Sequence, residues 1–166
     1  MARAKKIGIS ITEEPEKDRL VIEIKDDGIG MEEEVIQKAM DPFFTTRSSR
    51  KVGLGLSLMD QAAREAGGML RIESELGKGT TVTATFQYHH IDRKPLGNMT
   101  ETMTTLLIGN PELDIVYTHQ KEKKEYAFKS QWLRERFNDQ SFFSPEAIQW
   151  LRKHLQDGLT QIGVRG

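Results

Sequence analysis

The alternation of apolar and polar residues in two separate pairs of short segments most constrains the fold of this chain. Residues 6–25 alternate on both sides of a polar turn that contains Pro15, which predicts a β-hairpin. Residues 69–75 and 80–88 alternate again on either side of Leu76-Gly77-Lys78-Gly79, which predicts a second hairpin. Antiparallel hairpins with one apolar face need a covering layer.

The residues between the two hairpins carry helical patterns that can supply this layer. Glu32-Glu33-Glu34 places acidic residues in a helical first turn, and Pro42 ends that short helix. A second helix runs from Leu54 to Ala66, where apolar residues recur at helical spacing, and Gly67-Gly68 ends it. The segment between the helices, residues 43–52, is polar and basic. The order of elements predicts an α/β fold, a two-layer sandwich.

A change in composition at residues 93–97 suggests a boundary between a first domain, residues 1–92, and a small α+β extension, residues 93–166. In the extension the pattern predicts a helix near 99–108, strands near 114–119 and 125–129, and two further helices. The last helix begins at Ser144-Pro145-Glu146, which combines an N-cap, a proline at N1 and an acidic first turn.

The last helix has an apolar seam formed by Ile148, Leu151, Leu155, Leu159 and Ile162. The seam can dock a partner, but packing against the chain's own hairpin is favoured. Five aromatic residues of the extension are expected in its core: Trp132, Phe137, Phe142, Phe143 and Trp150.

Composition excludes several classes of protein. The chain has 166 residues, with 24 basic and 25 acidic, so it carries no basic face typical of nucleic-acid binding. It has no cysteine, which excludes a disulfide framework or a thiolate metal site. No apolar run is long enough to span a bilayer. We therefore expect a cytoplasmic protein.

Three short motifs lie in the loops between the predicted elements. Asp26-Asp27-Gly28-Ile29-Gly30 follows the first hairpin, and Asp41-Pro42-Phe43-Phe44-Thr45-Thr46-Arg47 follows the first helix. Val52-Gly53-Leu54-Gly55-Leu56 opens the second helix, where backbone N–H groups and the helix dipole favour an anion such as phosphate. Each motif alone is a weak signal, but together they can build a nucleotide pocket.

In order and spacing these motifs resemble those of the GHKL ATPase superfamily, which includes gyrase, the heat-shock chaperone of ninety kilodaltons, histidine kinases and mismatch-repair ATPases. The resemblance covers roughly residues 2–86 and is strongest to the ATP-binding domain of histidine kinases. Gly77-Lys78-Gly79-Thr80 is similar to the hairpin that closes that domain. The resemblance implies a sandwich of the histidine-kinase type that binds ATP or ADP.

By this resemblance, Asp26 accepts a hydrogen bond from the adenine amino group and Thr80 supports that contact through water. The resemblance places the following further residues at the nucleotide: Gly28, Gly30, Phe44, Thr45, Thr46, Arg47, Lys51, Gly53, Leu54, Gly55 and Leu56. Plainer interpretations stay open, since an aspartate before glycine often caps a turn, and glycine often occupies a turn position that has a positive φ. A basic loop such as Arg47–Lys51 is often simply solvated, and Thr80 is also an ordinary strand residue.

The sequence departs from the family pattern in two places. Lys51 stands where the second glycine motif usually begins. Residues 2–7 resemble only the end of the family's first helix, which carries the asparagine that holds Mg²⁺. We therefore expect Mg²⁺ for the family but no ligand for it in this chain, and catalysis by the chain stays open.

His90-Ile91-Asp92 is superficially similar to the phosphoacceptor motif of sensor kinases. In that motif the acid directly follows the histidine, and the motif precedes the ATP-binding domain on a helix. Here it follows the last strand of the second hairpin. We expect His89 and His90 to end a strand, and no pair of histidines has the spacing of a metal site.

The resemblance implies a domain that transfers the γ-phosphate of ATP to a protein acceptor. The acceptor is a histidine, as in sensor kinases, or a serine of a partner, as in anti-sigma-factor kinases. The alternative is a non-catalytic adenine-nucleotide-binding module that regulates or binds another protein. The short segment between Phe44 and Gly53 disfavours a chaperone-like or mismatch-repair-like ATPase.

Overall fold

The computed structural model describes residues 4–39, 54–137 and 144–164. The strands are β1 (Lys6–Glu14), β2 (Arg19–Asp26), β3 (Met69–Glu75), β4 (Gly79–Gln87), β5 (Asp114–Lys121) and β6 (Lys124–Lys129). The helices are α1 (Glu33–Ala39), α2 (Leu54–Glu65), α3 (Met99–Gly109), α4 (Ser130–Arg136) and α5 (Pro145–Gln161), with a 3-10 turn η1 (Pro15–Lys17). The two predicted hairpins and the predicted helices and strands of the extension are confirmed.

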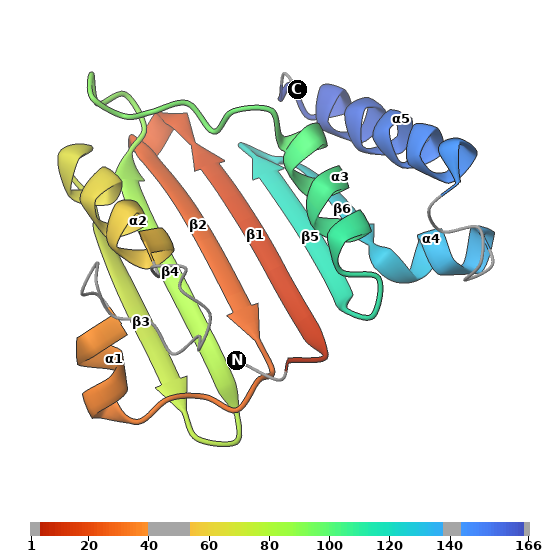
Figure 1. Ribbon diagram of the computed structural model, residues 1–166. Coiled ribbons are helices and arrows are strands. Elements are labelled where there is room, and N and C mark those ends of the chain that lie inside the picture. Colours follow the sequence, from red (N-terminus) through yellow and green to blue (C-terminus); the bar gives the residue numbers. More distant parts are fainter. Residues whose placement is uncertain (1–3, 40–53, 138–143, 165–166) are drawn as a thin grey trace.

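All six strands form one sheet in the order β3-β4-β2-β1-β5-β6 (Figure 1). Neighbouring strands are antiparallel except for β1 and β5, which run parallel along their whole length. A parallel pair needs a crossover connection, and here the chain between β1 and β5 includes the entire β2-to-β4 half of the sheet and α3.

The helices cover one face of the sheet, which confirms the two-layer α/β sandwich; in Figure 1, α2 and α3 lie in front of the strands and α1 lies beside β3. Strand register explains which face is covered. Ile11 and Leu20 point to the same side as Tyr117 and Phe128, and all four are buried in one core cluster. The intervening residues, such as Thr83 and Thr118, are half-buried on the opposite face.

The extension shares this sheet and this core. The predicted boundary at residue 92 falls between β4 and α3, and β5 hydrogen-bonds to β1 across it. The seam of α5 packs within the chain, as favoured from the sequence: Leu151, Leu155 and Leu159 are fully buried in the same cluster as Ile11.

The five aromatic residues of the extension divide into three groups. Phe137 and Trp150 pack partly buried against the core, whereas Trp132 is 39% exposed. Phe142 and Phe143 lie outside the described residues.

Serine and proline together start α5. The Ser144 hydroxyl accepts a hydrogen bond from Ala147 N at 3.1 Å, and Pro145 occupies the first helical turn. This is the N-cap that the sequence predicts, and it satisfies an otherwise free N–H group of the helix.

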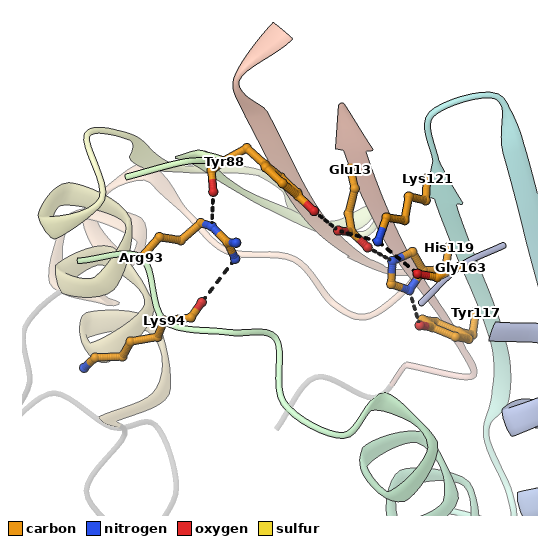
Figure 2. A network of polar contacts seen from close by, with 8 residues as sticks. All are labelled: Glu13, Tyr88, Arg93, Lys94, Tyr117, His119, Lys121 and Gly163. Carbon is orange, nitrogen blue, oxygen red and sulfur yellow. Dashed lines mark hydrogen bonds and ion pairs between the residues drawn. The ribbon is translucent and has the colours of Figure 1, made fainter. Parts of the chain in front are cut away.

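A buried polar network, shown in Figure 2, joins the extension to β1. By strand register it lies at the opposite end of β1 and β2 from Asp26. The Glu13 carboxylate accepts hydrogen bonds from His119 Nε2 at 2.8 Å and from the Tyr88 hydroxyl at 2.9 Å. The Tyr117 hydroxyl lies 2.7 Å from His119 Nδ1. Because a carboxylate only accepts, His119 Nε2 donates to Glu13, and because burial raises the pKa of Tyr117, the hydroxyl beside Nδ1 keeps its proton.

Two further residues complete this network. Lys121 Nζ donates to the Gly163 carbonyl oxygen at 3.0 Å and lies 3.9 Å from the Glu13 carboxylate. The ammonium group therefore ties the C-terminal end of α5 to β5 and adds positive charge beside Glu13.

Candidate functional site

Three polar side chains form a row across neighbouring strands at one end of the helix-covered face. Asp26 on β2 is the register partner of Thr80 on β4, and Thr80 is the register partner of Ser74 on β3. Side chains of directly opposed residues lie on the same face with Cβ atoms about 4.5–5.5 Å apart. The register therefore brings Asp26 and Thr80, both predicted from the sequence, side by side.

An apolar row lies next to the polar row on the same face. Ile24, Val82 and Ile72 occupy the adjacent inward-facing positions of the same three strands, and all three are half-buried. An apolar floor beside a few polar groups is the usual composition of a pocket for a small planar ligand.

The Asp26 carboxylate has two oxygens with different surroundings. Oδ1 accepts a hydrogen bond from Gly28 N at 2.8 Å, so Asp26 does cap the turn that follows β2. Within the described part of the chain, Oδ2 has no protein donor. One oxygen thus holds the turn, and the other is left as an acceptor.

Two glycines allow the loop after β2 to pack against the β3–β4 hairpin. Gly30 has φ +69°, and a Cβ there would lie 2.0 Å from the Glu75 carbonyl oxygen. Gly79 has φ +103°, and a Cβ there would lie 2.0 Å from the Asp26 carbonyl oxygen. Any other residue at either position would push the hairpin away from the loop that carries Asp26.

Ser74 is a site residue that the sequence interpretation missed. Its Oγ accepts from Met31 N at 2.8 Å, donates to the Gly79 carbonyl oxygen at 3.0 Å and lies 2.8 Å from Thr80 Oγ1. The signal was available in the pattern, because Ser74 occupies an inward-facing position of the β3 alternation, where Leu70 and Ile72 are apolar.

Asp27, interpreted from the sequence as an ordinary turn position, has a structural role next to the site. Its Oδ1 accepts from Lys5 N at 2.7 Å and Lys6 N at 2.8 Å. The backbone N–H groups of Lys6 and Lys5 lower the pKa of the Asp27 carboxyl below its usual value. Asp27 therefore ties the Asp26 loop to the start of β1.

The second glycine motif lies where α2 begins. Leu54 is the first residue of α2, Gly55 is exposed with open space around its Cα, and Leu56 is half-buried. Gly28 is buried in the turn after Asp26. The remaining predicted residues lie outside the described part of the chain: Phe44, Thr45, Thr46, Arg47, Lys51 and Gly53.

Within residues 4–39, 54–137 and 144–164, no three His, Asp or Glu side chains come together in a way that would hold a metal ion. Among the same residues, no helix combines the length and the apolar character needed to cross a bilayer. His90, the histidine of the phosphoacceptor-like motif, lies in a turn after β4 with its Nδ1 accepting from Asp92 N at 3.2 Å.

Comparison with known proteins agrees with the geometry. Residues 1–90, more than half of the chain, match the family model described as histidine kinase-, DNA gyrase B- and HSP90-like ATPase. The chain belongs to this ATPase family.

Sensor kinases are prominent among the relatives of this chain. It is 44% identical over 68 residues to the sensor kinase CckA of Brucella abortus, which is 40% of this chain and 7% of that protein. It is 42% identical over 65 residues to sporulation kinase E of Bacillus subtilis, covering 39% and 9% of the two chains. It is 34% identical over 87 residues to the sensor histidine kinase WalK of Bacillus subtilis, which is 49% of this chain and 14% of that protein.

The matched part of the chain is an ATPase domain of the type found in sensor histidine kinases, a family that binds ATP. The matches span 14% or less of the length of these three relatives.

Proposed function

We propose that this ATPase domain binds ATP or ADP. The adenine ring would lie between the polar row, which contains Asp26 and Thr80, and the helices that cover this face of the sheet. The observation that carries the proposal is the divided role of the Asp26 carboxylate. Oδ1 accepts from Gly28 N, and none of the described residues donates to Oδ2, which lies at the edge of an apolar floor. Adenine presents an amino donor at its 6-position, whereas guanine presents a carbonyl acceptor, so this oxygen favours adenine.

The phosphates would lie toward the start of α2. The N-terminus of a twelve-residue helix favours an anion through its backbone N–H groups and its dipole. Gly55 leaves open space there for a close approach. Within the proposal Phe44, Thr45, Thr46, Arg47, Lys51 and Gly53 complete the pocket, with Arg47 and Lys51 as the cations that face the phosphates.

We further propose that the protein transfers the γ-phosphate to a histidine or serine of a protein acceptor, since relatives are named as sensor and sporulation kinases. Magnesium would supply charge neutralisation at the phosphates. Among the described residues, no three His, Asp or Glu side chains come together around such an ion.

A non-catalytic, nucleotide-responsive module is the second candidate. It is favoured by the sheet that the matched residues share with residues 93–166, because β5 pairs with β1 along its whole length. Nucleotide binding at the end of β2 would then act on a segment outside the matched region. In this form the partner is a regulated protein rather than a phosphoacceptor.

Calorimetric titration of ATP into wild type and Asp26→Asn tests the pocket. The side-chain oxygen of the introduced asparagine can keep the bond to Gly28 N, which places its NH₂ group where the adenine amino group needs an acceptor. We expect about a five- to hundredfold loss of affinity. Asp27→Asn is the matched control, because its oxygen still accepts from Lys5 and Lys6, and we expect affinity within about twofold of wild type. Unchanged affinity of Asp26→Asn would remove Asp26 from the site.

Transfer of label from γ-phosphate-labelled ATP with Mg²⁺ separates the two candidate functions. Hydrolysis, or transfer to an added acceptor, supports the kinase. A folded sample that binds ATP and yields neither product supports the non-catalytic module.

A further inference from the structure

We infer that Ser74 is a specificity-determining residue that fixes the direction of the Thr80 hydroxyl, and so makes the pocket accept a 6-amino purine and reject a 6-oxo purine. This inference rests on the proposed binding of adenine nucleotide. It adds a residue on β3 and gives it a role distinct from holding the fold.

The Ser74 hydroxyl has a single proton to donate. Ser74 Oγ accepts from Met31 N at 2.8 Å and lies within hydrogen-bond distance of both the Gly79 carbonyl oxygen, at 3.0 Å, and Thr80 Oγ1, at 2.8 Å. A carbonyl oxygen cannot donate, so the bond to Gly79 requires the Ser74 proton. All three contacts form together only when Thr80 donates its own proton to Ser74.

The consequence for the pocket follows from the strand register. Thr80 is directly opposite Asp26, and both side chains lie on the helix-covered face. With its proton directed to Ser74, Thr80 presents only lone pairs to a ligand. Asp26 Oδ2 also only accepts. The two side chains thus form an edge of acceptors, which suits an amino group and opposes a carbonyl group.

Ser74 also holds the backbone around this edge. Met31 N binds its oxygen, and the Ile29 carbonyl oxygen accepts from Gly77 N at 2.8 Å, so the loop after Asp26 is attached to the β3–β4 hairpin at two points. A purely structural role for Ser74 would weaken all nucleotides equally. A role through the Thr80 proton changes their ratio.

The test measures the affinities of ATP and inosine triphosphate, which carries a 6-oxo group, for wild type and Ser74→Ala. Wild type should prefer ATP. Without Ser74 the Thr80 hydroxyl is free to donate to the 6-oxo group. The preference for ATP should therefore fall by about fivefold or more, the equivalent of one hydrogen bond.

Two further variants keep the test decisive. Thr85→Val is the matched control: Thr85 on β4 makes a similar cross-strand contact, accepting from Met69 N at 3.2 Å, but lies away from Asp26. We expect its ATP preference to match wild type. If Ser74→Ala fails to fold, Ser74→Cys keeps the size with a much weaker donor and should shift the preference in the same direction.

The outcomes are separable. If wild type binds neither nucleotide, the proposed function fails. If wild type binds ATP, and the affinities of the folded Ser74 variants for ATP and inosine triphosphate fall by the same factor, the inference about Ser74 is overturned while the proposed function stands. A fall in the preference for ATP that is confined to the Ser74 variants supports the inference about Ser74.

Discussion

Replacement of Glu13 by alanine tests whether the buried network holds the extension to β1. The Glu13 side chain is 8% exposed and the His119 side chain is fully buried. Removal of the carboxylate leaves His119 Nε2–H without a partner in a place that water does not reach. The Tyr88 hydroxyl loses its acceptor too, but Tyr88 is only half-buried and water can replace it.

The expected loss of stability follows from these contacts. A buried donor without a partner costs about 1–3 kcal/mol, and a hydrogen bond to a charged group contributes about 1.5–3 kcal/mol. The variant also no longer buries a carboxylate, which offsets part of this loss. We expect Glu13→Ala to lower the free energy of unfolding by about 2–3 kcal/mol, or the melting temperature by roughly 5–10 °C.

The same carboxylate predicts a pH dependence. Burial alone would raise the pKa of Glu13, but hydrogen bonds from His119 and Tyr88 and the charge of Lys121 outweigh it and hold the pKa below its ordinary value. The stabilisation is then present above the unfolded-state pKa of about 4.3 and is lost as pH falls through the lower folded-state pKa. The difference in stability between wild type and Glu13→Ala should shrink below about pH 4.

Urea unfolding followed by circular dichroism between pH 3 and pH 7 measures both effects. Glu16→Ala, at an exposed position in η1, is the control and should change stability by less than about 0.5 kcal/mol. If Glu13→Ala at pH 7 is as stable as this control, the network does not contribute as its geometry implies. A difference that stays constant down to pH 3 would contradict the assignment of the pH dependence to Glu13.

Two further predictions concern the hairpin and the extension. Gly79→Ala should destabilise the protein by about 2–4 kcal/mol and weaken ATP binding, because its Cβ would lie 2.0 Å from the Asp26 carbonyl oxygen. Gly77→Ala is the control: its Cβ meets open space, and it should cost about 1 kcal/mol. Equal effects of the two variants in urea unfolding and ATP titration would refute this. Deletion of residues 93–166 should abolish cooperative unfolding, because it uncovers Ile11 and Leu20 in the shared core, and a sharp urea transition of the shortened chain would show otherwise.

Local patterns carried most of the information about elements. The alternation in residues 6–25 and the Ser144-Pro145 cap predicted β1, β2 and α5, because alternation and capping depend only on neighbouring residues. The motifs around Asp26 and Gly55 were also sufficient to indicate the family, which the family match confirms.

These local patterns could not predict how strands far apart in the sequence pair with one another. Nothing near residue 114 in the sequence indicates that β5 runs parallel to β1, or that His119 meets Glu13. Such pairings depend on which strands are adjacent, and that depends on how the whole apolar surface is buried.

For the candidate site the sequence by itself determined the types of residue present: an aspartate beside a glycine turn, a threonine at a hairpin and a glycine-rich helix start. Only the tertiary structure placed Asp26 opposite Thr80, divided the two oxygens of Asp26 and put Ser74 beside both Thr80 and Gly79. The physical reason is that a motif specifies local backbone conformation, whereas the direction of a hydroxyl proton depends on acceptors from separate strands and loops.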